Sequence, residues 1–490
     1  MVEMEGLVRK SESGRHAEVQ CGRMSAGALS PPSPPLFVLL ANSLEQQIRD
    51  GVYRRGDKLP SLREIAASRG YGKNTVVSAF ELLVARGLVE PRRGSGFFVK
   101  EIIDGAGGQA VDSHLPRRAM DIVWLMRMQL RNEPGQLAVG DAFPPSEWLA
   151  GARLDRSHHK VARGGLGALF RYGDRLGYAP LRHRLVRRLA DVGIDAHPQQ
   201  IVLTHGANEA IDLIVRYFVP PGGVALIDDP GYYPLLGKLH LAGARIVGVP
   251  RLADGPDLQA LEHVLQAERP RLFFTQSLAH NPTGSDLSQA KAQAVLRLAE
   301  QHNLLLVEND ALSDFRPATA PRLSALDGLE RTLYLGSFSK SLSAALRVGY
   351  VACSADLAQD LADLKILTAV SSSEYAERAV ETLLAERRHA RHLEQLRAQL
   401  AEATHNAYAL LDRMGAEVFV RPAHSLFIWA RWPGFDDAQA LAQSMLDLDI
   451  VMAPGNIFSV DSERVSPWSR CNPHAVQDPR FARALERLRG

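Results

Sequence analysis

The chain has 490 residues, of which 46% are hydrophobic and 23% charged, and its formal net charge is +2. This length is typical of two or more domains, and the composition excludes a wholly disordered or fibrous protein. No apolar run approaches the roughly 20 residues that a membrane-spanning helix needs, and the N-terminus does not resemble a secretory signal. Cys21, Cys353 and Cys471 are too few and too scattered for a disulfide framework or a zinc cluster. We therefore expect a cytoplasmic protein with no membrane contact and no metal site.

Charge is unevenly distributed along the chain. Residues 1–35 end in a proline-rich stretch and are expected to form a flexible extension. Residues 36–100 contain eleven Lys and Arg against six Asp and Glu, whereas the remainder of the chain is slightly acidic. A basic segment joined to an acidic body predicts a module that binds a polyanion. On charge alone, a solvated basic face is an equally good interpretation.

Periodicity inside the basic segment predicts a definite order of elements. Apolar residues at helical spacing from Leu36 indicate a first helix, and Ser61 with Glu64 forms a capping-box sequence that starts a second. A third helix is predicted over residues 74–85, followed by two short strands around a glycine turn at residues 92–96. This order is that of a winged helix-turn-helix.

In a winged helix-turn-helix the recognition helix enters the major groove, and the basic hairpin tip lies along the phosphates or the minor groove. Each candidate contact taken alone is more often a surface residue, but together they cluster at helix starts and at the wing. The candidates are Arg63, Lys73, Asn74, Thr75, Arg92, Arg93 and Gly94. The stretch from Gly56 to Val99, GDKLPSLREIAASRGYGKNTVVSAFELLVARGLVEPRRGSGFFV, resembles the GntR-type repressor domain, and the resemblance covers residues 36–100. It implies double-stranded operator DNA as a partner.

Beyond the basic segment, residues 101–140 are predicted to be a linker with one short helix near residues 122–130. Residues 141–490 then alternate amphipathic stretches with short apolar runs, which predicts an α/β domain with a mostly parallel sheet. The strand candidates are residues 201–203, 224–227, 271–274, 304–307 and 333–335.

Four of these strands end in small-residue or polar motifs, where open α/β folds place ligands. The first is followed by Thr-His-Gly-Ala-Asn-Glu, a helix start that can bind phosphate, and the second by Asp-Pro-Gly-Tyr-Tyr. The third is followed by His-Asn-Pro-Thr-Gly, and the fifth by Gly-Ser-Phe-Ser-Lys-Ser, whose Lys340 could form a Schiff base. Taken singly, each has a simpler explanation: an ordinary helix start, a packed aromatic or a surface lysine.

Taken together, the motifs "DPGYY", "HNPTG" and "SFSK", the last seven residues before Arg347, resemble the fold-type-I aminotransferases that depend on pyridoxal phosphate. The resemblance covers about residues 140–490. A GntR-type domain joined to such a body is the layout of the MocR subfamily of transcriptional regulators. The resemblance implies pyridoxal 5′-phosphate as the cofactor.

The resemblance also implies roles for single residues. Lys340 would hold the cofactor covalently, Tyr232 would stack on its ring, and Asn281 would donate to its phenolate oxygen. The phosphate would be bound by Gly206, Ala207, Asn208, Ser337, Ser339 and Arg347. Ala207 stands where a phosphate-binding hydroxyl is common, which predicts slightly looser binding.

Two further residues matter for assembly and for the ligand. Tyr172 matches the tyrosine that reaches the phosphate of the neighbouring subunit, which implies a homodimer with shared active sites. Arg470 matches the arginine that clamps the carboxylate of a substrate or effector. A small amino compound with a carboxylate or sulfonate group is therefore the expected ligand.

The chain departs from the family at the fourth strand. The family usually has Glu-Asp-Asp-x-Tyr where this chain has Glu-Asn-Asp-Ala-Leu at residues 308–312. Without a gap, Asn309 replaces the aspartate that pairs with the ring nitrogen, and Leu312 replaces the tyrosine near the phenolate oxygen. A neutral amide stabilises a protonated ring nitrogen less than a carboxylate does, so the electron sink weakens. Asp310 could take over only if the strand shifted by one residue, which would reverse the facing of its side chains.

Three functions remain open from the sequence. The first is a transcription factor whose aminotransferase-like body senses the cofactor or an amino compound and thereby changes operator binding. The second is an active aminotransferase that carries a DNA-binding domain. The third is a body that has lost the cofactor and serves only as a dimerisation scaffold, against which the intact Lys340, Ser337 and Arg347 argue.

Overall fold

The computed structural model describes residues 36–489 apart from residues 50–51, 55, 93–94, 101–121, 123–125, 127–134 and 164–169. The predicted N-terminal extension, most of the predicted linker helix, and Arg93 and Gly94 of the wing lie outside the described residues. In the part of the chain that is described, no helix is both long enough and apolar enough to span a bilayer.

The N-terminal module has the predicted order of elements. It consists of α1 (Leu36–Arg49), α2 (Leu62–Arg69), α3 (Lys73–Ala85), β1 (Val89–Arg92) and β2 (Gly96–Val99). The capping box at the start of α2 is formed, because Glu64 N–H donates to Ser61 Oγ at 3.2 Å and Ser61 N–H donates to the Glu64 carboxylate at 2.7 Å. The two strands pair antiparallel, with Val89 opposite Val99.

The body is built on an eight-stranded sheet. Its strands, in spatial order, are β3 (Ile201–Thr204), β10 (Gly349–Ala352), β9 (Thr332–Ser337), β8 (Leu305–Asn309), β7 (Leu272–Thr275), β4 (Val224–Asp229), β5 (Arg245–Leu252) and β6 (Gly255–Pro256). The five strands from β9 to β5 pair in parallel, while β10 is antiparallel to both of its neighbours. The predicted mostly parallel α/β fold is confirmed.

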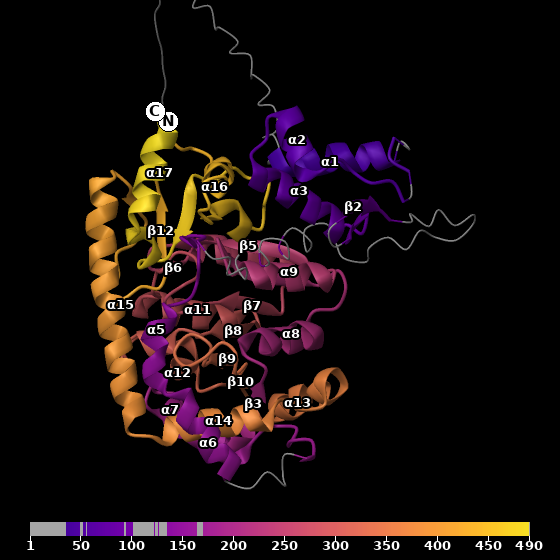
Figure 1. Ribbon diagram of the computed structural model, residues 1–490. Helices are drawn as coiled ribbons and strands as arrows, with labels where there is room; N and C mark the ends of the chain where they lie inside the picture. Colours follow the sequence, from indigo (N-terminus) through magenta and orange to yellow (C-terminus); the bar gives the residue numbers. More distant parts are fainter. Residues whose placement is uncertain are drawn as a thin grey trace, which may run out of the picture. The chain divides into compact units, whose positions relative to one another are not determined.

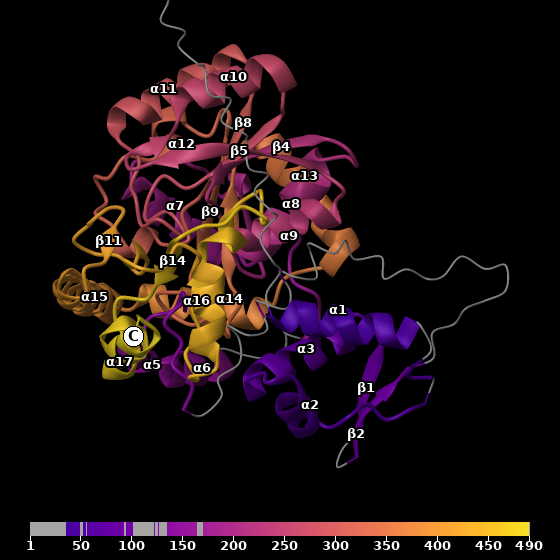
Figure 2. The ribbon, with the colours of Figure 1, turned by 90° about the horizontal axis from the view of Figure 1, so that it is seen from above.

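Helices cover both faces of this sheet (Figures 1 and 2). One face carries α8 (Ala207–Phe218), α9 (Tyr233–Leu241) and α13 (Ala355–Ala369), and the other α10 (Leu258–Glu268), α11 (Gln289–Gln301) and α12 (Leu323–Asp327). Because successive strand residues point to opposite faces, each β8 side chain belongs to one layer or the other. Val307 packs in the layer of α8, and Leu306 packs in the layer of α11. This alternation decides which side chain of β8 faces the ligand side.

The rest of the body surrounds this sheet. A second sheet, in the order β11-β12-β14-β13, is antiparallel and contains β11 (Glu417–Val418), β12 (Ile428–Arg431), β13 (Ala453–Pro454) and β14 (Trp468–Cys471). The remaining helices are α5 (Ser146–Leu149), α6 (Leu154–Arg163), α7 (Ala179–Ala190), α14 (Glu374–Ala385), α15 (Arg388–Arg413), α16 (Ala438–Leu446) and α17 (Pro479–Arg489). Leu137 and Val139, from the predicted linker, are buried in the core of the second sheet.

Candidate functional site

The first part of the site lies where β3 turns into α8. Gly206 stands before α8 with φ 74°, a left-handed conformation that glycine adopts without steric cost. The free N–H groups at the start of α8 and the positive end of its dipole suit an anion. Ala207 and Asn208, in the first turn, are half-buried. A helix start that suits an anion is therefore present at the predicted position.

Arg347 is brought to the same place by β10. Its guanidinium donates from Nη2 to the carbonyl of His205 at 2.9 Å, and a Cβ on Gly206 would lie 2.8 Å from that same nitrogen. Gly349 pairs with Thr204 on one side and with Ser337 on the other, so it joins the two strand ends. A Cβ there would come within 2.7 Å of the backbone of Gly206, so only glycine permits this approach.

Lys340 follows Ser337 and Ser339 in the turn after β9. Ser339 N–H donates to Ser337 Oγ at 3.2 Å, which fixes the turn, and Lys340 Nζ lies 3.0 Å from the centre of the Phe143 ring. Burial lowers the pKa of Lys340 to about 7, with smaller effects from the Asp141 carboxylate, which raises it, and from the nearby arginines, which lower it. A large share of Lys340 is thus the neutral, nucleophilic amine near neutral pH.

A small recess lies at the ends of β4, β7 and β8. Tyr232, Gln276 and Asn309 line it, and apolar side chains from α8, α9, β4, β7 and β9 contribute to its wall. The buried polar residues Asp228, Thr275 and His280 line it as well. Asn309 Oδ1 is buried and has no hydrogen-bond partner in the described part of the chain. An unpaired buried amide beside an aromatic ring is a place for a polar planar ligand.

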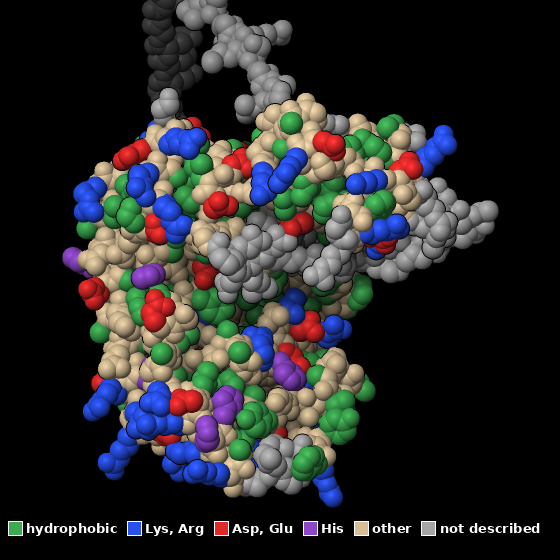
Figure 3. Space-filling model, viewed as in Figure 1, with side chains coloured by type: hydrophobic (Ala, Val, Ile, Leu, Met, Phe, Trp, Pro, Cys, Tyr) green, Lys and Arg blue, Asp and Glu red, His purple; other side chains and the backbone are tan. Residues whose placement is uncertain are grey.

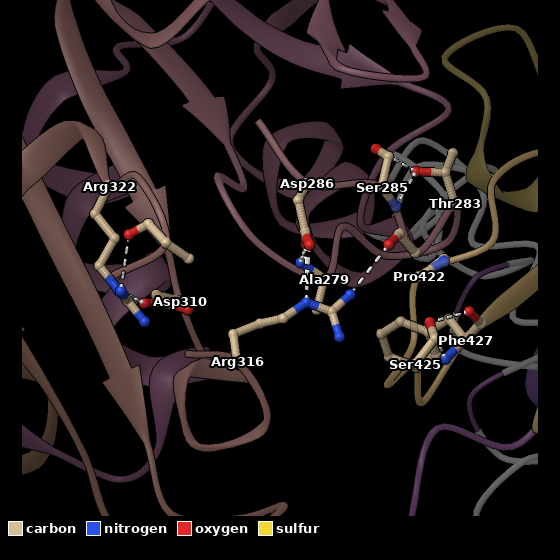
Figure 4. A network of polar contacts seen from close by, with 12 residues as sticks. Ala279, Thr283, Ser285, Asp286, Asp310, Arg316, Arg322, Pro422, Ser425 and Phe427 are labelled. Atoms are coloured by element: carbon tan, nitrogen blue, oxygen red, sulfur yellow. Dashed lines mark hydrogen bonds and ion pairs between the residues drawn. The ribbon is translucent and has the colours of Figure 1, made fainter. Parts of the chain in front are cut away.

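Asp310 is not in this recess. Its carboxylate accepts from Arg322 Nε at 2.7 Å (Figure 4). It also accepts from the Tyr334 hydroxyl at 3.0 Å, and all three side chains are buried. Glu308, on the same face of β8, accepts from the first N–H groups of α12 at 2.9 and 2.8 Å. Asp310 and Glu308 are thus held by the α12 side of the sheet, and Asn309 between them faces the recess.

Leu312, which stands at the tyrosine position of the family, packs in an apolar cluster with Phe315 and Phe427. It offers no polar atom to a ligand.

Arg470, on β14, is nearly fully buried. Its Nη1 donates to Asn281 Oδ1 at 2.8 Å and its Nη2 donates to the Gly140 carbonyl at 2.7 Å, while Nε has no partner in the described residues. The guanidinium carbon of Arg470 lies 5.1 Å from the centre of the Phe427 ring and 5.0 Å from the centre of the Phe458 ring. A fixed, partly unsatisfied guanidinium is suited to clamp a carboxylate. Arg470 and Asn281, predicted from separate motifs, are in direct contact.

Tyr172 lies apart from these residues within this chain, with 81% of its surface exposed. Phe143 and Asp141, which precede α5, were not recognised from the sequence as site residues. They follow the predicted linker, and no motif marks them. Their proximity to Lys340 arises because Arg470 and Asn472 hold the backbone of Gly140 and Phe143 on β14.

The DNA-binding candidates fall into two groups. Arg63 and Lys73 are exposed, and Arg92 is exposed beside Glu90, with which it forms an ion pair at 2.9 Å. Asn74 and Thr75, at the start of α3, instead hydrogen-bond to residues 443–449 of the body. The first group is accessible to DNA, whereas the side chains of the second group are already hydrogen-bonded to the body.

The residues of the body fit pyridoxal phosphate. The helix start and Arg347 suit a phosphate dianion, the neutral Lys340 suits an aldehyde, and the buried, unpaired Asn309 Oδ1 suits the edge of a polar ring. Among the described residues, no group of three His, Cys, Asp or Glu side chains is placed to hold a metal ion.

Comparisons with known proteins agree with this arrangement. Residues 143–488 match the family "Aminotransferase class I and II", and residues 39–99 match "Bacterial regulatory proteins, gntR family". The chain is 32% identical over 441 residues to the HTH-type transcriptional regulator YdcR of Escherichia coli, covering 88% of this chain and 92% of that protein. It is 28% identical to the probable rhizopine catabolism regulatory protein MocR of Rhizobium meliloti, covering 77% of this chain and 78% of that protein.

Among solved structures, the body is similar to LysN, the alpha-aminoadipate aminotransferase of Thermus thermophilus, determined with N-(5'-phosphopyridoxyl)-L-leucine. The TM-score is 0.68 at 27% identity, covering 74% of this chain and 95% of LysN. The fold of the body is thus that of a pyridoxal-phosphate-dependent enzyme. The chain belongs to the class I and II aminotransferase family and, with its gntR-type N-terminal domain, is a transcriptional regulator of the MocR type.

Proposed function

We propose that the aminotransferase-like body of this regulator binds pyridoxal phosphate and an amino compound, and that their binding changes the affinity of the N-terminal domain for its operator. The proposal depends most on one observation. Asn309, a neutral amide, occupies the recess wall, while the neighbouring carboxylate of Asp310 is tied to Arg322 on the other face of β8.

When bound, pyridoxal phosphate supplies an aldehyde that condenses with amines and a ring that withdraws electrons. The residues of this chain divide the work of binding it. The start of α8 and Arg347 hold the phosphate, Lys340 presents a neutral amine, and Tyr232 covers the ring. Arg470 orients the carboxylate of an incoming amino compound, and Asn281 holds the Arg470 guanidinium in place. Asn309 cannot carry the negative charge that would keep the ring nitrogen protonated, so binding is retained while bond cleavage is slow.

A homodimer is part of the proposal. Phe170, Tyr172, Leu367 and Val370 are apolar or aromatic side chains with 85%, 81%, 85% and 45% of their surfaces exposed. In Figure 3, hydrophobic side chains are visible over the region of α13, which supplies Leu367. Large apolar side chains that are exposed to this extent favour an interface between protein chains. In a dimer, Tyr172 would reach the partner's cofactor phosphate.

The alternative function is an active aminotransferase with an attached DNA-binding domain. It is supported by 30% identity over 341 residues to the 2-aminoadipate transaminase of Thermus thermophilus, covering 68% of this chain and 84% of that protein. Lys340, Asn281 and Arg470 are all compatible with it.

Operator affinity measured by fluorescence anisotropy tests the proposal. The duplex is selected by the full-length protein from a random-sequence pool, and affinity is measured with pyridoxal phosphate and a panel of L-amino acids. We expect one or more amino acids to change the affinity about tenfold, within the usual range of coupling between sites, and only when Lys340 is present. Equal affinity under all conditions, in the wild type and in Lys340→Ala alike, would refute effector sensing. Rapid consumption of one amino acid would favour the enzyme instead.

A further inference from the structure

The start of the recognition helix α3 is covered by the segment that follows α16. Asn74 Nδ2 donates to the Leu446 carbonyl at 2.6 Å and reaches the Asp449 carboxylate at 3.3 Å. Thr75 Oγ1 donates to the Asp447 carboxylate at 3.1 Å. These hydrogen bonds join residues more than 370 positions apart in the chain, and they lie within one contact unit that spans residues 34–490.

The contact is closely fitted. Gln443 Nε2, on the last turns of α16, donates to Thr75 Oγ1 at 3.1 Å, so the threonine hydroxyl is saturated and buried. Gly72, just before α3, leaves no room for a side chain, because a Cβ there would lie within 2.7 Å of the Asp447 carboxylate. Packing of this kind requires the two backbones to meet in a particular register.

The segment presents to α3 the kind of groups that DNA presents. DNA offers phosphate oxygens and base-edge acceptors to the side chains and N–H groups at the start of a recognition helix. Here a carbonyl and two carboxylates, from Leu446, Asp447 and Asp449, accept from the same side chains. The carboxylates would also repel a phosphate backbone that approached α3. Asn74 and Thr75 cannot serve DNA and this segment at once.

A continuous series of hydrogen bonds leads from this contact to the ligand-clamping arginine. The Asp449 carbonyl accepts from Leu137 N–H at 2.9 Å, and Val451 N–H donates to the Leu137 carbonyl at 2.8 Å. The Val451 carbonyl accepts from Gly140 N–H at 2.9 Å, and the Gly140 carbonyl accepts from Arg470 at 2.7 Å. The two hydrogen-bonded segments, residues 137–140 and 449–453, therefore connect the recognition helix to Arg470.

We propose that residues 443–449 are a docking surface for the recognition helix, which competes with DNA for Asn74 and Thr75. While the contact is formed, which we call the closed state, Asn74 and Thr75 are not available to DNA. A ligand whose carboxylate binds Arg470 shifts residues 137–140 and so changes how often the contact is formed. The second part rests on the proposed function, because it needs an effector at Arg470. The first part stands on the contact alone.

A reversible crosslink tests the docking surface directly. The double variant Gly72→Cys, Asp447→Cys is made in a Cys21→Ser background, which leaves only the buried Cys353 and Cys471 besides the new pair. Gly72 has φ −61°, which any residue adopts, and the Asp447→Cys substitution removes the carboxylate that a Cβ at Gly72 would meet. We expect oxidation of DNA-free protein to join the two cysteines and to weaken duplex binding by about tenfold or more, as loss of major-groove contacts does. Reduction of the same sample restores binding.

Two results would overturn the docking surface: failure of the cysteines to pair in DNA-free protein, and equal duplex affinity of the crosslinked and reduced forms. A second variant removes the competitor instead. Asp447→Ala deletes a charge-assisted hydrogen bond and should tighten duplex binding about tenfold. Asp436→Ala is the matched control, because Asp436 is exposed and precedes α16, and its substitution removes the same charge. An equal gain in duplex affinity in both variants would mean that loss of any negative charge has this effect, and it would contradict the proposal.

The coupling to Arg470 is tested by the rate of crosslinking. The amino acid of the panel that most changes operator affinity should change the oxidation rate of the double-cysteine variant, because it changes how often the contact is formed. An unchanged rate would overturn the coupling and leave the docking surface intact. If no amino acid alters operator affinity, the proposed function fails, while the crosslinking result for the docking surface still stands.

Discussion

The two ends of the proposed cofactor pocket follow the family pattern to different extents. At the phosphate end, Gly206, Arg347 and Gly349 form a fitted cup in which each glycine is required by its neighbours. At the ring end, Asn309 has replaced a carboxylate and Leu312 has replaced a phenol. In the proposed function, holding the cofactor and driving its chemistry would therefore depend on separate residues. A change at the ring end can weaken catalysis while the phosphate end still retains the cofactor.

The largest expected effect comes from Lys340, the amine that would bind the cofactor covalently. Lys340→Ala removes the amine that captures the cofactor, so the visible absorption of bound cofactor should be lost entirely. Lys291→Ala, which changes a lysine ion-paired with Asp254 on α11, is the control and should keep it. A persistent visible band in Lys340→Ala would show that another amine captures the cofactor.

The Asp310→Asn variant tests whether Asn309 or Asp310 faces the ring of the cofactor. Asp310→Asn leaves the Arg322 charge buried without a counter-ion, so the free energy of unfolding should fall by about 3 kcal/mol, measured by urea denaturation. Asp286→Asn, which faces Arg316 in a more exposed ion pair (Figure 4), is the control and should cost about 1 kcal/mol. An Asp310→Asn protein of wild-type stability that loses the cofactor would place Asp310 in the pocket.

Gly206→Ala breaks the phosphate end alone. The new methyl group would meet Arg347 Nη2 at 2.8 Å at a backbone with φ 74°, and cofactor affinity should fall about tenfold or more. Gly222→Ala provides the matched control, because Gly222 has φ 76° but nothing within 4 Å of the new Cβ. Both variants place an alanine at a similar positive φ, so only Gly206→Ala should lose affinity in a fluorescence titration with pyridoxal phosphate. Equal loss in both would mean that strain, and not the cup, sets the affinity.

Asn309→Asp restores a carboxylate at the ring end. It should increase the rate at which amino acids convert the bound cofactor to its aminated form by about tenfold or more, since each 1.4 kcal/mol of stabilisation gives a factor of ten. Cofactor affinity should change little, because the phosphate end is untouched. Stopped-flow absorbance measures the rate, and no gain in rate would contradict the placement of Asn309 beside the ring.

The smallest expected effect is on the pH dependence of cofactor capture. Because the pKa of Lys340 is about 7, the neutral amine is the minor form below pH 7 and the major form above it. The rate constant for capture should therefore rise between about pH 6 and pH 8 and then level off. Asp141→Asn should move the midpoint to lower pH, since the Asp141 charge raises the pKa of Lys340. A midpoint near the ordinary lysine value would contradict burial of the amine.

Much of the fold was predictable because its signals are local. The capping box at Ser61 and the apolar period of α3 lie within a few residues, and the buried strands of the main sheet are continuous apolar runs. The strands β5 and β10 were missed. The first contains Arg245, Gly248 and Pro250, and the second begins at Gly349 and ends at Ala352, two residue types that are disfavoured in strands, so neither has a strong strand pattern. The second sheet, β11 to β14, was missed for the same reason.

Site residues that belong to motifs could be predicted, and those defined by distant contacts could not. Nothing near Asp310 in the sequence indicates its pairing with Arg322, and nothing near Phe143 indicates its position over Lys340. The start of α3 was predicted to face DNA, but the burial of Thr75 depends on a segment more than 360 residues away. Tertiary packing, not local pattern, decides these positions.

The central claim is that the pocket holds its cofactor but turns over slowly. The most direct test is the visible spectrum of the full-length protein loaded with pyridoxal phosphate, followed after addition of each L-amino acid in turn. The account predicts a band that requires Lys340, that shifts on binding of an amino acid, and that persists for many minutes without conversion to the aminated cofactor. Rapid and complete conversion with any one amino acid would contradict it and identify the protein as an active aminotransferase.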